Sequence, residues 1–500
     1  MKHLFFKSKT LFTAIVLCVL GCINVAAANI ERPKLVIGIA VDQMRWDYLY
    51  RYYDLYTEGG FKRLMNEGYN YENTMINYIP SVTAIGHSSI YTGSVPAIHG
   101  IAGNNFYKDG KFTYCCADST VSTVGTKSKA GMMSPCNLLA TTIGDELKVA
   151  TNFQSKVIGI ALKDRAAILP AGHGANGAYW MDFDNAKFVT STYYMNKLPN
   201  WVEKYNRTIG KATKDQIRYS PLGNKLTVEM AKAAIEGEQL GMGAATDMLT
   251  ISFSCPDMIG HKYGTHAPIT QDIYTDLDQR LADFFSFLDQ KIGKGNYLVF
   301  LTADHGAANN IKMLQDHKIA AGGFYPKEVK EKLDKCLQEK FHTTKSLVYT
   351  ISDYKVFLDH NAIADMGLDL ATVRTAVVDC LKNDSQFAFV ADLDHIAEAS
   401  MPAVIKEKAI NGYNRFRSGD VQLILQPAHY EIYNSKDVGG TTHGLWNPYD
   451  AHIPFLVMGW HVKHGVTQAQ TYITDIAPTI CSLIHIQMPN GCIGTSAEGK

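Results

Sequence analysis

Short apolar runs alternate along the chain with segments that have helical periodicity. Six runs rich in Val, Ile and Leu are bounded by turn residues and predict buried strands: KLVIGIAVD (34–42), KVIGIAL (156–162), DMLTISFS (247–254), NYLVFLTAD (296–304), VQLILQP (421–427) and IPFLVMGW (453–460). Helices are predicted for GFKRLMNEG (60–68), TTIGDELKVAT (141–151), LTVEMAKAAIEGEQL (226–240), IYTDLDQRLADFFSFLDQKI (273–292) and DIAPTICSLIHI (475–486). This alternation predicts an α/β fold in which a mostly parallel central sheet is covered by helices on both faces.

The stretch from about residue 311 to residue 420 interrupts this alternation. It predicts a charged helix from Pro326 to Glu339, a strand from Leu347 to Leu358 and a second helix from Asp369 to Asn383. We therefore expect an inserted cap region beside the main sheet. The predicted organisation is a leader over 1–28 and one large domain over 29–500 that carries this insertion.

The N-terminus has the three parts of a secretory signal. MKHLFFKSKT is basic, LFTAIVLCVL is apolar and GCINVAAAN supplies small residues. The apolar run, about ten residues long, is too short to span a bilayer comfortably. This pattern predicts cleavage after Ala28 and export of the protein, which would be periplasmic or secreted. The alternative is that VLGC is a lipobox, with Cys22 lipidated and the protein anchored to the outer membrane. No later segment predicts a transmembrane helix.

Charge and cysteine content narrow the class of protein further. The chain has 48 basic and 48 acidic residues and no basic stripe, which argues against a nucleic-acid partner and against a charged membrane surface. Export permits disulfides among the eight cysteines that follow the leader. Adjacent Cys115 and Cys116 are expected to pair elsewhere rather than with each other.

Three predicted strands end in carboxylates. Asp42 and Asp304 close two of them, and Asp257 follows a third. A single aspartate at a strand end often only caps the next turn. Parallel strands, however, bring their carboxyl ends to one edge of the sheet, where ligands bind. Three carboxylates there, with histidines beside them, predict a functional site.

The histidines near these carboxylates have spacings that suit metal ligation. Asp257 and His261 are four residues apart, so they share one face of a helical turn. His305 follows Asp304 directly, and His443 lies in the Gly-rich segment GGTTHGLW. Mixed His and carboxylate ligands without Cys fit zinc best, with manganese as the alternative. Three Asp and three His divide into two sites of three ligands, and two metals about 4 Å apart suit phosphoryl transfer. The remaining candidates are expected to be structural or surface histidines: His87, His99, His173, His266 and His464.

The stretch INYIPSVTAIGHSSIYTGSVP (76–96) offers hydroxyl groups as candidate nucleophiles. It predicts a proline-terminated loop that runs into a helix. Ser81 and Thr83 lie at the helix start, where free N–H groups favour an anion. Chemistry alone does not separate these two. The other hydroxyls lie within or beyond the helix: Ser88, Ser89, Thr92 and Ser94.

Together these motifs resemble the alkaline phosphatase superfamily, and most closely its PafA-type members near the nucleotide pyrophosphatase/phosphodiesterases. The resemblance runs from about Lys34 to DIAPTICSLIHIQMPNG and is carried by VDQMRWDYL, IPSVTAIGHSSIYTGSVPAIHGIAGNN, ALKDRAAI, SCPDMIGHKYG, LTADHGA and GTTHG. It implies one zinc on Asp257, His261 and His443, and another on Asp42, Asp304 and His305 together with the nucleophile's oxygen. It also implies that Thr83 is the nucleophile, which leaves Ser81 as a cap or a supporting group. Asn104, Lys163 and Arg165 would contact the phosphoryl oxygens.

The implied activity is phosphate monoester hydrolysis through a phosphothreonine. Charged residues after a strand are usually solvated, but Lys163 and Arg165 are two residues apart, which in extended chain places them on one face. Cations beyond the metals favour a dianionic monoester over a diester. The alternatives are a phosphodiesterase or nucleotide pyrophosphatase on the same scaffold, and a secreted metal-binding protein without turnover. Sulfatases are disfavoured because no C-x-P-x-R or S-x-P-x-R element is present.

Overall fold

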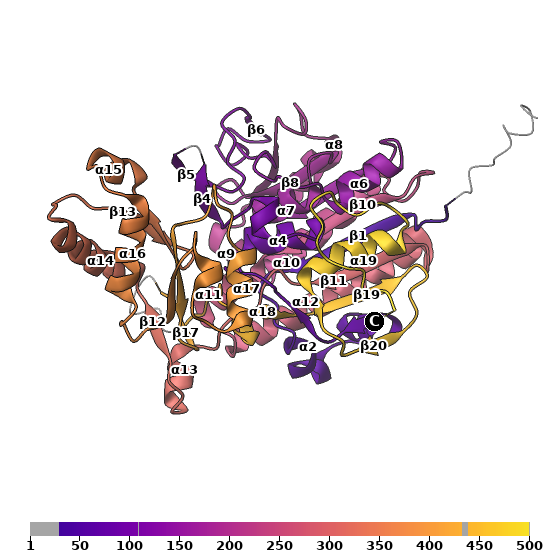
Figure 1. Cartoon of the computed structure of the whole chain (residues 1–500). Helices are drawn as coiled ribbons and strands as arrows, with labels where there is room; N and C mark the ends of the chain where they lie inside the picture. Colours follow the sequence, from indigo (N-terminus) through magenta and orange to yellow (C-terminus); the bar gives the residue numbers. More distant parts are fainter. Residues whose placement is uncertain (1–29, 109, 433–438, 500) are drawn as a thin grey trace, which may run out of the picture. The chain divides into compact units, whose positions relative to one another are not determined.

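The main sheet carries the site residues at one edge. The computed structural model describes residues 30–108, 110–432 and 439–499 (Figure 1), so the predicted leader and Cys22 lie outside the described residues. Ten strands form this sheet. In spatial order they are β20 (Gly465–Thr467), β2 (Tyr69–Tyr71), β19 (Phe455–Gly459), β11 (Tyr297–Thr302), β1 (Leu35–Val41), β10 (Asp247–Phe253), β7 (Val157–Ala161), β8 (Gly177–Asp182), β9 (Lys187–Ser191) and β6 (Thr123–Val124).

The five central strands, β11, β1, β10, β7 and β8, run parallel to one another, and β19 and β9 flank them antiparallel. Leu35 of β1 pairs in register with Asp247 of β10 and with Tyr297 of β11. Every residue of β1 is buried, as expected for a strand covered on both faces. The predicted α/β class is therefore confirmed. The run 421–427, however, is absent from this sheet, because it pairs in a second one.

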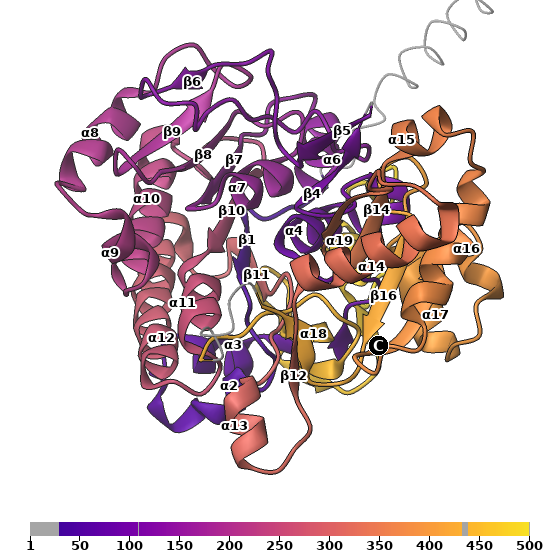
Figure 2. The same ribbon diagram turned by 90° about the vertical axis from the view of Figure 1, so that its left-hand side faces the viewer.

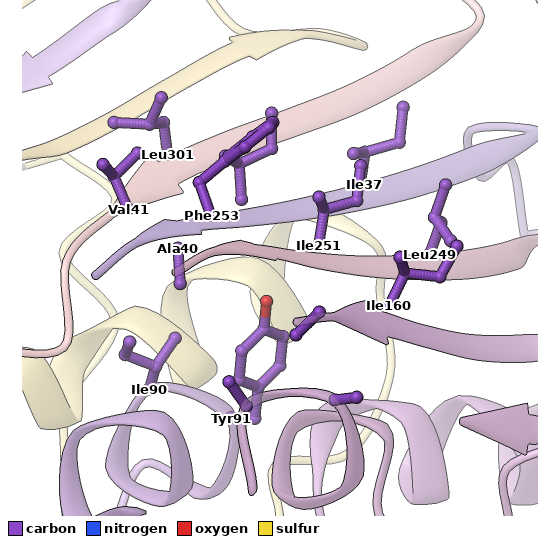
Figure 3. Packing of buried hydrophobic residues seen from close by; sticks show 14 of the residues in the cluster. Ile37, Ala40, Val41, Ile90, Tyr91, Ile160, Leu249, Ile251, Phe253 and Leu301 are labelled. Atoms are coloured by element: carbon purple, nitrogen blue, oxygen red, sulfur yellow. The ribbon is translucent and has the colours of Figure 1, made fainter. Parts of the chain in front are cut away.

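Helices cover both faces of the main sheet (Figures 1 and 2). One layer consists of α4 (Thr83–Thr92), α6 (Ile143–Ala150), α7 (Asp164–Ala171) and α19 (Ile476–Leu483), and the other of α3 (Phe61–Glu67), α8 (Asn200–Thr208), α10 (Leu222–Glu238), α11 (Cys255–Tyr263) and α12 (Pro268–Leu288). Figure 3 shows Tyr91 of α4 directed at the strands. A Cβ at Gly38 in β1 would lie 2.4 Å from the Tyr91 hydroxyl oxygen. Glycine at this position therefore lets α4, which carries Thr83, pack close to β1.

A second sheet occupies much of the range expected as an insertion. Its order is β13 (Val348–Ser352), β14 (Lys355–Leu358), β16 (Val421–Leu425) and β15 (Phe387–Asp392), all antiparallel. The helices α14 (Pro326–Phe341) and α16 (Leu370–Leu381) share a buried cluster with it. The single strand expected over 347–358 is wrong, because the chain reverses at Asp353 and Tyr354 and makes a hairpin. The domain boundaries themselves stay a prediction.

Cysteine pairing differs from the expectation. Cys336 and Cys380 form a disulfide that joins α14 to α16. Among the described residues Cys115 and Cys116 form no disulfide; both are buried in the core of the main sheet, with their Sγ atoms 4.0 Å apart. The expectation that they pair elsewhere is therefore wrong.

The remaining elements are short. They are the helices α2 (Tyr48–Arg51), α5 (Pro96–His99), α9 (Lys214–Arg218), α13 (Ile311–Asp316), α15 (His360–Asp365), α17 (Ala403–Asn411) and α18 (Pro448–Ala451), and the strands β3 (Thr74–Met75), β4 (Asn105–Lys108), β5 (Lys111–Tyr114), β12 (Gly322–Phe324), β17 (His429–Glu431), β18 (His452–Ile453) and β21 (Thr471–Tyr472). Among the helices in the described ranges, none has the length and apolar character needed to cross a membrane.

Candidate active site

Three adjacent strands deliver carboxylates to one edge of the main sheet. β1 leads into Asp42, β11 leads into Asp304, and β10 leads into α11, whose first turn carries Asp257. Because β11, β1 and β10 are neighbours and parallel, their carboxyl ends meet. All three side chains are buried. The structure therefore brings the predicted carboxylates together.

Two clusters of metal-type ligands form at this edge. The first cluster is Asp257, His261 and His443, and the second cluster is Asp42, Asp304 and His305; within each, the ligand atoms lie within 4.8 Å of one another. His261 Nε2 lies 3.0 Å from Asp257 Oδ1, since the two residues are one turn apart on α11. The rings of His305 and His443 stack with their centroids 3.4 Å apart. The two clusters are therefore immediate neighbours.

The hydrogen bonding and protonation of these side chains suit the binding of a cation. Asp42 Oδ1 is buried and has no hydrogen-bond partner among the described residues. Burial and the neighbouring Asp257 and Asp304 raise the pKa of Asp42. Burial also lowers the pKa of His305 and His443, which keeps both imidazoles neutral and able to ligate. Unpaired carboxylate oxygens beside neutral imidazoles are the donor set of a metal site.

The two candidate nucleophiles separate clearly in space. Thr83 is the first residue of α4, and its Oγ1 lies 3.4 Å from His305 Nε2. Ser81 instead donates its hydroxyl to the carbonyl of Leu445 and accepts from His443 Nδ1 through its own carbonyl. Ser81 does not cap the helix, because Val82 is the N-cap and makes no side-chain cap bond. Thr83 is thus the hydroxyl that faces the second cluster.

Asn104 and Lys163 approach the clusters from two other elements. Asn104 precedes β4, and its Oδ1 accepts a hydrogen bond from the main-chain N–H of Ala84 at 3.1 Å. Lys163 is the N-cap of α7, and its Nζ lies 2.7 Å from Asp42 Oδ2 and 2.5 Å from Asp257 Oδ2. Asp257 and Asp42 outweigh the effect of burial and raise the pKa of Lys163. This ammonium group therefore lies between the two clusters.

Arg165 lies within α7 rather than in extended chain. The expectation that Lys163 and Arg165 share one face of an extended segment is therefore wrong, because the helix begins between them. The Arg165 charge still acts on Lys163. Arg165 Nη1 donates to the hydroxyl of Tyr114 at 3.1 Å, and its buried Nε has no partner in the described part of the chain. Tyr114 in turn donates to Asp164 Oδ1 at 2.5 Å.

Three residues at the site have roles that sequence reasoning missed. His87, expected to be structural or on the surface, is buried with its Nδ1 3.2 Å from Asp304 Oδ2. Gln43 donates from its side chain to Asp257 Oδ1 at 2.8 Å and from its main chain to Asp304 Oδ1 at 3.1 Å. The third residue is Tyr114, whose hydroxyl accepts from Arg165. His87 lies four residues after Thr83, so the helical repeat was a usable signal, whereas nothing in the sequence around Tyr114 marks it.

A cavity of about 620 Å³ opens beside the first cluster. Its lining includes Val82, Asn104, His261 and His443, and it continues past the first cluster to Tyr219 and Met258. A volume of this size accommodates a small organic ligand. The site therefore combines a buried hydroxyl, two metal-type clusters and space for a substrate.

Comparison with known proteins places the chain in a family. The family model described as type I phosphodiesterase / nucleotide pyrophosphatase matches residues 36–446. The protein named alkaline phosphatase PafA from Elizabethkingia meningoseptica is 45% identical over 532 residues, which covers 96% of each chain. The chain belongs to the PafA-type alkaline phosphatases.

Two further matches span nearly the whole chain. The crystal structure of wild-type alkaline phosphatase PafA matches with a TM-score of 0.90 and 45% identity, covering 94% of this chain and 99% of that one. A Myroides odoratus protein named calcium-transporting ATPase is 47% identical over 546 residues, 99% of both chains. As a member of the PafA type, this protein is an alkaline phosphatase, and its family is metal dependent.

Proposed function

We propose that this alkaline phosphatase is exported and hydrolyses small phosphate monoesters through a phosphothreonine on Thr83 at a two-zinc site. The observation that carries the proposal is the position of Thr83. Its hydroxyl begins α4, lies 3.4 Å from His305 Nε2 and faces the second cluster, while Asn104 and Lys163 stand nearby. Free N–H groups and the dipole at the helix start favour both the alkoxide and an incoming phosphate.

The reaction has two balanced steps. In the first, the Thr83 hydroxyl gives up its proton, its Oγ1 bonds to phosphorus and the bond from phosphorus to the ester oxygen breaks; the departing oxygen takes up one proton, so an alcohol is released and no net proton is gained or lost. In the second, water attacks the phosphothreonine, which releases inorganic phosphate and restores the hydroxyl. Zinc ions held by the two clusters would lower the pKa of a ligated hydroxyl and stabilise the developing negative charge.

Three side chains favour a monoester. Asn104, Lys163 and Arg165 would supply hydrogen bonds and two positive charges to the phosphoryl oxygens. Lys163, which now pairs with Asp42 and Asp257, would be free for this task if those carboxylates held metal, and the Arg165 Nε has no partner among the described residues. Preorganised charge of this kind acts most strongly on a dianion.

The second candidate is a phosphodiesterase or nucleotide pyrophosphatase activity. The cavity favours it, because Tyr219, Met258 and Ile432 line space that a second ester substituent could occupy. The comparisons give the third alternative, a metal-binding protein without turnover, no support. Transport is not among the activities we propose.

The deciding experiment compares 4-nitrophenyl phosphate with methyl 4-nitrophenyl phosphate, which share a leaving group. We expect higher kcat/KM for the monoester, and we expect Lys163→Ala with Arg165→Ala to reduce it about 100-fold or more while the diester loses far less. Lys156→Ala is the matched control, because Lys156 lies at the opposite end of β7. An equal loss on both esters would remove the basis for a monoester preference.

Separate measurements test the metal, the nucleophile and export. Elemental analysis should find two zinc ions per chain, and full activity in metal-free protein would refute the two-zinc site. Brief mixing with ³²P-labelled monoester should label the wild type and not Thr83→Ala. If Ser81→Ala were inactive and Thr83→Ala active, Ser81 rather than Thr83 would be the nucleophile.

Fractionated cells should yield a periplasmic or secreted protein whose sequence begins at Asn29, unless lipidation of Cys22 retains it at the outer membrane.

A further inference from the structure

The tip of the β13–β14 hairpin reaches from the second sheet into the active site. Its two turn residues, Asp353 and Tyr354, line the same cavity as Asn104 and His443. Both have left-handed backbones, with φ of +48° and +60°. Two-residue hairpin turns of this shape strongly favour glycine at the second position, and a tyrosine there costs free energy. A side chain kept at an unfavourable position indicates that the side chain itself is needed.

Asp353 fixes the main chain of Asn104. Its Oδ2 accepts a hydrogen bond from the Asn104 N–H at 3.2 Å, and a Cβ at Gly103 would lie 2.6 Å from the same oxygen. The Asn104 Oδ1 is already held by the N–H of Ala84, the residue after Thr83. Asn104 is therefore held on two sides. Its Nδ2 makes no hydrogen bond among the described residues and remains as the donor for a substrate oxygen.

The next two residues hold neighbouring segments. Tyr354 donates its hydroxyl to the carbonyl of His443 at 3.0 Å, and its ring occupies the space above Gly444, where a Cβ would lie 2.4 Å from Tyr354 Cε2. The buried Lys355 Nζ donates to the carbonyl of Ala102 at 3.3 Å. The consecutive residues Asp353, Tyr354 and Lys355 thus hold in place the two loops that carry Asn104 and His443.

We propose that this hairpin tip is a positioning element of the active site: Asp353 sets the amide of Asn104 for the phosphoryl group, and Tyr354 sets the loop of His443. The proposal rests on the role of Asn104 in the proposed function. Asp353 and Tyr354 act through Asn104 and His443, so they are positioning residues. The second sheet then contributes to catalysis indirectly, through the geometry of the two loops that carry Asn104 and His443.

Asp353→Gly is the decisive variant. Glycine adopts a positive φ without strain, which offsets part of the cost of leaving the Asn104 N–H without its acceptor, so the melting temperature should change little. The kcat/KM for 4-nitrophenyl phosphate should fall about 10- to 100-fold, and the inhibition constant of inorganic phosphate should rise by a similar factor. Asp353→Asn keeps an acceptor oxygen and should restore activity to within about threefold of wild type.

A double-mutant cycle separates positioning from a purely structural role. In an Asn104→Ala background, Asp353→Gly should cause no further loss of kcat/KM. An equal loss in both backgrounds, or an activity loss that follows a falling melting temperature, would overturn the proposal. If Asn104→Ala alone kept full activity, the proposed role of Asn104 would be refuted, and this part of the inference with it.

Tyr354→Phe tests the second contact through metal binding. Loss of the hydroxyl should lower the chelator concentration that removes half of the zinc about tenfold, as for other groups that orient a ligand. Tyr349→Phe is the matched control, because Tyr349 lies on the same hairpin with an exposed side chain. Equal chelator resistance of the two variants would overturn the role of Tyr354.

Discussion

Tyr114→Phe should weaken catalysis by removing support from Arg165. The Tyr114 hydroxyl accepts from Arg165 Nη1 at 3.1 Å and donates to Asp164 Oδ1 at 2.5 Å. It is the side-chain partner that holds the guanidinium group in place in the described part of the chain. Phenylalanine keeps the ring and its packing, so the change removes only these two hydrogen bonds.

The magnitude follows from the charge on Arg165. A hydrogen bond to a charged group contributes about 1.5–3 kcal/mol, which corresponds to roughly 10- to 150-fold in kcat/KM if the whole contribution is expressed in the transition state. Because Arg165 keeps its charge in the variant, we expect a loss near the lower end, about 10-fold. The loss should be larger for 4-nitrophenyl phosphate than for methyl 4-nitrophenyl phosphate.

The assay is steady-state kinetics on Tyr114→Phe, Arg165→Ala and the double variant, with Tyr107→Phe as the matched control. Tyr107 lies on β4, the partner strand of β5, and its ring packs against Tyr349 and Phe357 instead. Tyr114→Phe should add little to the loss caused by Arg165→Ala. The reasoning would be refuted if Tyr114→Phe matched wild type while Arg165→Ala was impaired, or if the two losses simply multiplied.

Three further predictions concern stability. Burial lowers the pKa of His99 from 6.5 to about 3, so the unfolded chain binds a proton that the folded chain does not. The stability that neutral His99 gives the folded state is fully present above pH 6.5 and is lost as the pH falls toward 3, by about 1.4 kcal/mol per pH unit. In urea unfolding between pH 7 and pH 4, the free energy of unfolding should therefore fall less steeply with decreasing pH for His99→Gln than for the wild type. The disulfide Cys336–Cys380 closes a loop of 44 residues, so the double Ser variant should lose about 4 kcal/mol in guanidinium unfolding, and no loss would contradict the loop-closure argument. Buried Asp278 accepts from the N–H groups of Thr57 and Phe61, and Asp278→Ala should cost about 3 kcal/mol or more, measured by the same unfolding assay; a cost below about 1 kcal/mol would show that water satisfies these groups.

Local patterns were enough to predict five of the ten strands of the main sheet, β1, β7, β10, β11 and β19, and to expect carboxylates where parallel strands end. The apolar runs that became β1, β10 and β11 are continuous because both faces of these strands are buried, and such runs are visible without any structure. Parallel strands align their carboxyl ends, so Asp42 and Asp304 were expected together. The helical repeat likewise places Asp257 beside His261. Thr83 was selected over Ser81 only by resemblance to a family.

The failures of sequence reasoning share a different cause. The segment 347–358 has a strand pattern throughout, but it reverses at Asp353 and Tyr354, which carry no Gly or Pro signal. Arg165 lies in a helix that begins one residue after Lys163, a boundary that a charged pair does not reveal. The run 421–427 resembles a core strand of the main sheet and pairs elsewhere, because pairing partners are chosen by long-range packing.

The sequence by itself determined which residues can do the chemistry: the carboxylates and histidines of two metal-type clusters and a hydroxyl at a helix start. Only the tertiary structure decided which of them touch. His443 reaches Asp257 from 186 residues away, and Asp353 reaches Asn104 from 249 residues away. The physical reason is that periodicity records how each segment buries its own apolar face. Contacts between distant loops depend instead on how those buried faces are stacked against one another.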